Sequence, residues 1–159
     1  MRANDLPLAR LIALLLPVAL LGGALLSEHV GGLFPCEMCH WQRWPHAAAI
    51  ALAGLSFLVS RTSLRRSLVM LAALAIGLSG AIGVFHAGVE YGWWQGITAC
   101  TSHIDAGGGD LLAAIVRAPI IRCDVAQWSF LGISLAGLNA IASLAGAGAI
   151  LHLAHRRRR

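Results

Sequence analysis

The sequence has little charge and no lysine at all. Of its 159 residues only 12% are charged, whereas 58% are hydrophobic, and the mean hydropathy is +0.74. A soluble domain usually has about a quarter of its residues charged, so this shortage excludes disordered and collagen-like chains and most soluble enzymes. The net charge of +5 comes from twelve arginines in short runs, with no basic stripe interleaved with aromatic residues. That distribution argues against nucleic-acid binding and favours a lipid bilayer around the chain.

Four long stretches are almost free of charged residues. Each is close to the length of about 20 residues that crosses a bilayer as a helix, and backbone groups in hydrocarbon must be paired within the segment. The sequence therefore predicts an all-α fold, a single integral membrane domain over residues 1–159 built as a four-helix bundle. The expected helices cover about 8–27, 44–60, 67–89 and 129–153, and the loops between the first and second and the third and fourth cover about 28–43 and 90–128.

The arginines are distributed unequally between the two sides of this bundle. Nine lie at the termini and in the connection between the second and third helices, and three lie on the other side: Arg2, Arg10, Arg61, Arg65, Arg66 and residues 156–159 against Arg43, Arg117 and Arg122. Because cytoplasmic loops are enriched in basic residues, both termini are predicted to be cytoplasmic. The terminal run 156–159 then suits an anchor on anionic lipid.

The first apolar stretch has an alternative interpretation as a cleaved signal peptide. Arg2 and Arg10 precede it, and Gly22 and Ala24 resemble a small-residue cleavage site. The stretch is long for a signal core and lacks an A-x-A sequence, so a membrane helix is the favoured interpretation.

All four cysteines fall in the two non-cytoplasmic loops. Cys36 and Cys39 form a C-x-x-C in the first loop, and Cys100 and Cys123 lie in the second. Disulfides persist on that side of a bacterial membrane. Four cysteines allow three pairings, and the short C-x-x-C spacing favours a reactive pair because a structural disulfide gains more from closing a long loop. Spacing alone leaves both redox and structural roles open.

Two features around Cys39 favour redox chemistry. The second apolar helix begins just after Cys39, so we expect this sulfur at or near a helix N-terminus, where the dipole favours a thiolate. Arg43 follows at i+4 on the same face, and a guanidinium at the membrane boundary is costly without a partner. The chain has no nucleotide-binding motif, so a quinone dissolved in the bilayer is the expected electron acceptor, with Trp41 and Trp44 available to pack against its ring.

These residues carry a resemblance to a known family. The segment Pro35 to His46, with its C-x-x-C followed by Gln42 and Arg43, is similar to the corresponding segment of the disulfide bond formation protein B (DsbB) family. The stretch Glu90 to Thr101 and the later Arg122 to Trp128 resemble the second external loop of that family, and the similarity spans essentially the whole chain.

The resemblance implies a thiol:quinone oxidoreductase of the bacterial inner membrane, with ubiquinone or menaquinone as cofactor and a DsbA-like periplasmic thiol oxidase as partner. It implies that Cys100 is attacked by the reduced oxidase, that its partner Cys123 exchanges with Cys36, and that Cys39 faces the quinone. Arg43 would orient the quinone ring, and Gln42 and His86 are further candidates for the quinone pocket.

Three alternatives remain at this stage. A vitamin K epoxide reductase-like enzyme also couples a C-x-x-C to a quinone, but its C-x-x-C lies by a late helix. A disulfide-braced structural protein would explain the same cysteine count. A tetrahedral zinc site made by the four cysteines is a further possibility within this class, although an oxidising compartment works against four free thiolates. A membrane cytochrome with His46 and His86 as haem ligands would leave all four cysteines unexplained.

Overall fold

The computed structural model describes residues 5–98, 101–102 and 120–155. Four helices account for most of this part of the chain: α1 (Leu6–His29), α2 (Glu37–Leu58), α3 (Thr62–Glu90) and α5 (Leu135–His155). Two short antiparallel ladders accompany them, β1 (Thr101–Ser102) with β2 (Ile120–Ile121), and β3 (Ser129–Phe130) with β4 (Ile133–Ser134). The described chain is therefore predominantly helical, as the sequence predicts.

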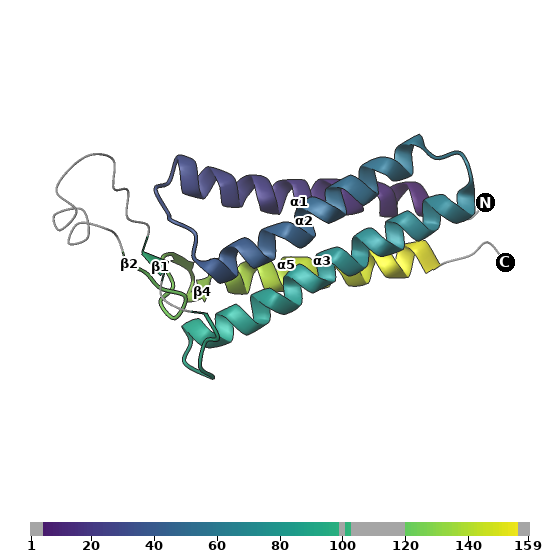
Figure 1. Ribbon diagram of the computed structural model, residues 1–159. Helices are drawn as coiled ribbons and strands as arrows, with labels where there is room; N and C mark the ends of the chain where they lie inside the picture. The colour runs from purple at the N-terminus through teal and green to yellow at the C-terminus, as the bar shows by residue number, and fades with distance from the viewer. Residues whose placement is uncertain (1–4, 99–100, 103–119, 156–159) are drawn as a thin grey trace.

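The helices lie side by side along their lengths (Figure 1). α3 packs most extensively against α5 and α2, and α1 packs against α2 and α5. The first turn of α1, the last turn of α5 and the short α2–α3 connection lie at one end of the molecule. The α1–α2 connection and the strands lie at the other end (Figure 1), so segments far apart in the sequence meet there.

Three of the helices are long and apolar enough to cross a membrane. These are α1, α3 and α5. α2 is comparable in length at 22 residues, but its first three turns carry polar and charged residues such as Glu37, Gln42 and Arg43, which lower its hydropathy. The protein is accordingly a membrane protein with three candidate spans among the described residues.

Helix α2 begins earlier than the apolar pattern predicts. The sequence places the start near residue 44, but the helix starts at Glu37. The difference arises because apolar character marks contact with lipid, whereas the first turns of α2 turn polar side chains such as Gln42 and His46 into the protein interior, where both are buried.

Helix α5 begins later than predicted, at Leu135 instead of near residue 129. A tight hairpin of β3 and β4 occupies the intervening residues, with Leu131 and Gly132 both at positive φ, at 51° and 81°. Positive φ at both central residues is typical of a two-residue hairpin turn. Tyr91, just after α3, fixes this hairpin because its hydroxyl donates to Gly132 O and accepts from the Ser134 N–H.

Candidate active site

Two of the cysteines stand at the beginning of α2. Cys36 precedes the helix in an extended conformation and Cys39 lies in the first turn. Their sulfurs are 3.3 Å apart, with the Cys36 thiol donating to Cys39, and both are free thiols here. The hydrogen bond to Cys39 and burial raise the pKa of Cys36 to about 12. Cys36 thus holds its proton, and Cys39 receives it as a hydrogen bond at the positive end of the helix dipole.

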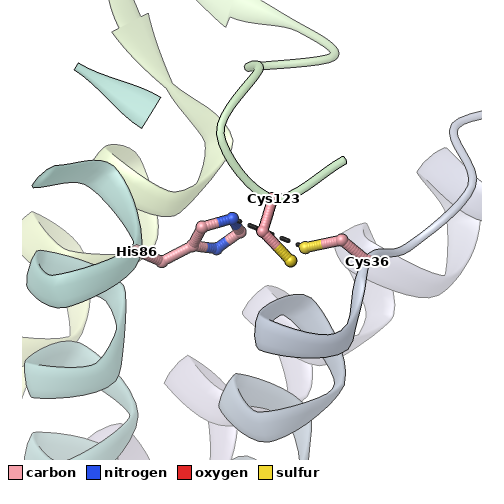
Figure 2. Close-up of side chains that lie close together, drawn as sticks. All are labelled: Cys36, His86 and Cys123. Carbon is pink, nitrogen blue, oxygen red and sulfur yellow. Dashed lines mark hydrogen bonds between the residues drawn. The ribbon is translucent and has the colours of Figure 1, made fainter. Parts of the chain in front are cut away.

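A third cysteine reaches the same place from the other connection. Cys123 follows β2, and its sulfur, the Cys36 sulfur and a ring nitrogen of His86 all lie within 4.8 Å of one another (Figure 2). Thr98 donates a hydrogen bond to the Cys123 sulfur at 3.2 Å. Burial raises the pKa of the Cys123 thiol. One cysteine from each predicted pair therefore lies beside the other, and exchange between the two connections needs no large displacement. Cys100 lies outside the described residues.

His86 and Glu90 line the inner side of this cysteine cluster. His86, near the end of α3, points toward Cys36 (Figure 2), and its Nε2 is 3.4 Å from the Cys36 sulfur. Glu90 lies one turn later, with its carboxylate 3.7 Å from the same nitrogen. The His86 side chain is only 2% exposed and that of Glu90 only 7%. A sulfur, an imidazole and a carboxylate thus share a site largely shielded from bulk water, where electrostatic interactions are strong.

Cys36, His86 and Cys123 also form a set of three ligand atoms suited to a metal ion. Thiolate and imidazole are the ligands that zinc prefers, and structural zinc sites usually have four. The set differs from the four-cysteine site considered from the sequence, because it includes His86 and leaves Cys39 out. The same closeness of sulfurs serves thiol–disulfide exchange, which also needs two sulfurs within reach of each other.

Arg43 lies one turn deeper in α2 and faces α1. It forms an ion pair with Glu28 and donates a second hydrogen bond to Ala24 O at 3.3 Å. The carboxylate offsets the cost of holding a guanidinium at the membrane boundary. Because Glu28 and Ala24 belong to the end of α1, the pair fixes where α1 stands relative to the Cys36–Cys39 end of α2.

A chain of polar side chains fills the interior behind the cysteines. Gln42 contacts His86 at 2.8 Å and Asn139 of α5 at 2.8 Å. Asn139 in turn contacts His46 at 2.9 Å, and Ser79 of α3 lies 2.9 Å from the same His46 nitrogen. Polar groups in an apolar interior are costly unless they are hydrogen-bonded, so this chain ties α2, α3 and α5 together.

A cavity of about 360 Å³ opens between the helices beside this chain. Apolar residues of α1 and α5 form much of its wall. The polar side chains among its lining residues include Cys36, Cys39, Gln42, Arg43, His46, His86, Glu90 and Asn139. A largely apolar cavity with a small number of placed polar groups is typical of a site for a small organic molecule.

Comparison with known proteins agrees with this geometry. The family described as disulfide bond formation protein DsbB matches residues 7–153. The chain belongs to the DsbB family. A disulfide bond formation protein B from Verminephrobacter eiseniae (strain EF01-2) is 31% identical in an alignment of length 143 that covers 80% of each chain. No solved structure matches. Membership in the family makes this chain a disulfide oxidoreductase, and the family is linked to quinones.

The structure brings most of the residues singled out from the sequence into one place. Cys36, Cys39, Gln42, Arg43 and His86 all line the cavity, and Cys123 lies beside Cys36. Asn139, Glu90 and Ser79 also belong to the site, although the sequence patterns did not single them out. The signal for Asn139 was present, since it is an amide inside an otherwise apolar stretch, and such a residue usually faces a partner within the protein.

Proposed function

We propose that this protein is a thiol:quinone oxidoreductase that reoxidises a DsbA-like periplasmic thiol oxidase and passes the electrons to a membrane quinone. The observation that carries the proposal is the junction of the cysteine cluster with the cavity. Cys39 belongs to both, since its sulfur is 3.3 Å from Cys36 and its side chain lines the cavity wall. Ubiquinone and menaquinone are both candidates for the acceptor.

The proposed topology has four membrane-spanning helices, both termini in the cytoplasm, and the cysteines on the periplasmic face of the inner membrane. A helix of 22 residues is about 33 Å long at 1.5 Å per residue, which is enough for α2 to cross beside the three candidate spans. The common location of the α1–α2 connection and the 121–134 segment at one end (Figure 1) supports a single side for the cysteines.

The residues around the cavity fit a quinone. The apolar wall from α1 and α5 suits a ring with an isoprenoid tail, and Arg43 supplies a cationic donor for a carbonyl oxygen. His46 lines the same cavity, and its buried Nδ1 has no hydrogen-bond partner in the part of the chain that the structure describes. A buried polar atom without a partner calls for a ligand or water. Bound there, a quinone supplies an acceptor for two electrons and two protons.

Different side chains of this protein carry out successive steps of the electron transfer. The reduced oxidase attacks a disulfide of Cys100 and Cys123, so a mixed disulfide forms with Cys100 and Cys123 leaves as a thiolate. A second oxidase thiolate then releases Cys100. Cys123 exchanges with Cys36 of a Cys36–Cys39 disulfide, which forms a Cys36–Cys123 disulfide and frees Cys39 as a thiolate near the start of α2. Attack of the Cys100 thiolate on Cys123 then re-forms the Cys100–Cys123 disulfide and releases Cys36 as a thiolate. Both electrons are then held by Cys36 and Cys39. Arg43 holds positive charge beside the Cys39 sulfur and stabilises negative charge that develops in the cavity.

Quinone reduction by the purified protein in detergent tests the proposal. The assay starts with a reduced DsbA-type protein and follows the loss of quinone, with Cys39→Ser and Cys100→Ser as test variants. His40→Ala is the matched control, because His40 follows Cys39 in the same turn but is exposed. We expect no turnover in either serine variant and unchanged turnover in the control. A protein that reduces no quinone, or that is purified with zinc and three or four free thiols, would overturn the proposal.

A further inference from the structure

The buried polar chain has a direction. It passes from Cys36 through His86, Gln42 and Asn139 to His46, with successive distances of 3.4, 2.8, 2.8 and 2.9 Å. An amide presents donors at its nitrogen end and acceptors at its oxygen end, and a neutral imidazole has one donor and one acceptor. Fixing the orientation of one member therefore fixes which nitrogen of each histidine carries the proton.

The Met38 carbonyl fixes the orientation of the Gln42 side-chain amide. The side-chain end of Gln42 that faces His86 also lies 3.1 Å from Met38 O, one turn earlier in α2. A carbonyl oxygen only accepts hydrogen bonds, so this end of the amide must be the NH₂ group. The opposite orientation would put two oxygens against each other. Gln42 consequently donates to His86 Nδ1, and its oxygen faces Asn139.

A second carbonyl, on another helix, gives the same direction. The end of the Asn139 amide that faces Gln42 Oε1 at 2.8 Å also lies 3.4 Å from the backbone oxygen of Ser79. Both neighbours are acceptors, so this end is again NH₂. The Asn139 oxygen is left to face His46 Nε2 at 2.9 Å and the Ser143 hydroxyl at 3.0 Å.

His46 must therefore carry its proton on Nε2. That nitrogen faces Asn139 Oδ1 and also the Ser79 hydroxyl at 2.9 Å, whose own hydrogen is donated to Gln42 O at 2.8 Å. The Ser143 hydroxyl lies 3.5 Å from the same nitrogen but donates its hydrogen to Asn139 Oδ1. None of the three neighbours therefore leaves a hydrogen for Nε2 to accept. In the neutral ring Nδ1 then holds a lone pair, and this is the buried atom that lacks a partner among the described residues.

His86 has the same tautomer as His46 but turns its other nitrogen, Nε2, toward the site. Its Nδ1 accepts from Gln42, so the neutral ring carries its hydrogen on Nε2. That nitrogen faces the Cys36 sulfur at 3.4 Å, with Glu90 at 3.7 Å. His86 thus offers a donor to the sulfur and has no free lone pair with which to remove a proton from it.

We propose that Gln42 is a positioning residue that fixes the tautomers of both buried histidines. His86 is held with an N–H toward the Cys36 sulfur, where it stabilises the thiolate that forms when Cys36 is the leaving group, as it is when the Cys36–Cys123 disulfide is opened. His46 is held with a lone pair available to a hydroxyl donor in the cavity, which suits a reduced quinone better than an oxidised one. The tautomers do not depend on the electron acceptor, whereas their use during turnover rests on the proposed function.

Nitrogen-15 NMR of histidine-labelled full-length protein in detergent tests the tautomers directly. Protonated and unprotonated ring nitrogens resonate far apart, and His46→Phe and His86→Phe spectra assign the two signals. In the reduced wild-type protein we expect Nε2–H and unprotonated Nδ1 in both rings. Nδ1–H in either ring would overturn the proposal without any variant being needed.

Gln42→Glu sharpens the test because a carboxylate can accept but cannot donate. We expect His86 to gain a proton on Nδ1, while His46 keeps its pattern, since Asn139 can still donate to the carboxylate. Asn139→Leu is the matched control at the other end of the polar chain of side chains. It should leave the His86 signals unchanged and remove the acceptor that holds the His46 proton on Nε2. An unaltered His86 signal in Gln42→Glu would contradict the role of Gln42.

The rate of disulfide reduction tests whether the His86 N–H stabilises the Cys36 thiolate. A small thiol reaches the half-buried Cys39 more readily than the buried Cys36, so Cys36 is the leaving thiolate in this assay. We expect reduction of the Cys36–Cys39 disulfide to slow at least roughly tenfold in His86→Phe, because the hydrogen bond from His86 to the charged Cys36 sulfur is lost. The assay contains no quinone, so it can fail while the proposed function stands. Equal affinities of wild-type and His46→Phe protein for a quinol analogue would likewise overturn the assignment of His46 alone.

Discussion

The two ends of the molecule differ in the side chains that fill the interior between the helices. At the end where α1 begins and α5 finishes, the interior is a cluster of mostly small apolar residues, which we call the apolar half: Leu6, Ala9, Ala13, Ala49, Ala53, Val69, Ala72, Ala73, Ile76, Ala147, Ile150 and Ala154. At the other end, the polar half, the interior holds hydrogen-bonded side chains and a cavity: Cys36, Gln42, His46, Ser79, His86, Asn139 and Ser143.

The different interiors of the two halves suit different roles, close helix packing in one and chemistry in the other. Small residues let helix backbones approach closely where lipid provides no hydrophobic drive, and they leave no polar group to satisfy. The polar half gives up part of that packing and keeps titratable groups away from water, which is costly unless every group has a partner. Among the described residues, the free cysteines and two of the three partnerless buried side-chain atoms, His46 Nδ1 and a Glu90 oxygen, occur in this half. The third such atom, Arg66 Nε, lies near the start of α3 at the other end. The cysteines beside titratable groups make the polar half the expected place for chemistry.

The largest expected effect concerns the reactivity of the cysteines in the polar half. With a pKa raised to about 12, Cys36 is a thiolate in only about one molecule in 10⁵ at pH 7, against a few per cent for an ordinary cysteine. Alkylation of Cys36 at pH 7 should therefore be about 10³-fold slower than that of an ordinary cysteine. Its rate should keep rising about tenfold per pH unit well beyond about pH 9. Mass spectrometry of the alkylated peptides of the reduced protein measures this.

Cys39→Ser is the control for that experiment. It removes the sulfur whose hydrogen bond is the main reason for the raised pKa, so Cys36 should react faster at pH 7 in the variant. If burial only slowed access, the rate would be low at every pH and would level off near pH 9 as for an ordinary thiol.

The next largest effect distinguishes two roles of Arg43, as a positive charge beside the cavity and as the ion-pair partner of Glu28. Arg43→Gln should lower quinone reduction by roughly 10²–10³-fold, the usual loss when a positioned donor is removed from developing charge. Glu28→Gln should cost much less, because the guanidinium remains. The double variant leaves no unpaired charge, so it should be as slow as Arg43→Gln. Recovery of turnover in the double variant would show that Arg43 acts only as a partner for Glu28.

The same comparison explains which features could be predicted from the sequence. Contact with lipid requires long apolar stretches, so helix positions follow from composition: a helix is expected over about 8–27, and α1 spans Leu6–His29. The start of α2 and the hairpin before α5 were missed, because the first is polar and the second depends on positive φ at Leu131 and Gly132.

Partners across the interior are harder to predict than elements. The C-x-x-C spacing indicates that Cys36 and Cys39 are neighbours. Only the family resemblance brings Cys123 to Cys36, and no pattern in the residues themselves places Cys123 or His86 beside it. Those contacts depend on how α3 and the 121–128 segment meet α2, which is a property of tertiary packing. The donor and acceptor roles of Gln42 and Asn139 depend on carbonyls that only the structure brings near.

The smallest expected effect compares two glycines on α3, one in each half. A Cβ at Gly83 would lie 3.0 Å from Ala136 O, 3.1 Å from Gln42 Oε1 and 3.2 Å from Ala140 N, whereas a Cβ at Gly77 would lie 3.6 Å from the Ala147 Cβ. Gly83→Ala should therefore destabilise the protein by about 1–3 kcal/mol as an overpacked site. Gly77→Ala should be neutral or stabilising by up to about 1 kcal/mol, because alanine favours the helix. Thermal unfolding in detergent measures both changes.

Because α5 backbone atoms near Gly83 cannot move independently of the helix, part of the strain should pass to Gln42. The Gly83→Ala variant should then also alter the NMR signals of His86 and His46, while Gly77→Ala leaves them unchanged. Equal stability losses at the two positions, with unchanged histidine signals in both, would mean that the polar half tolerates packing changes as the apolar half does. The close fit around Gly83 would then have no bearing on the orientation of Gln42, and the difference between the halves would lie in composition alone.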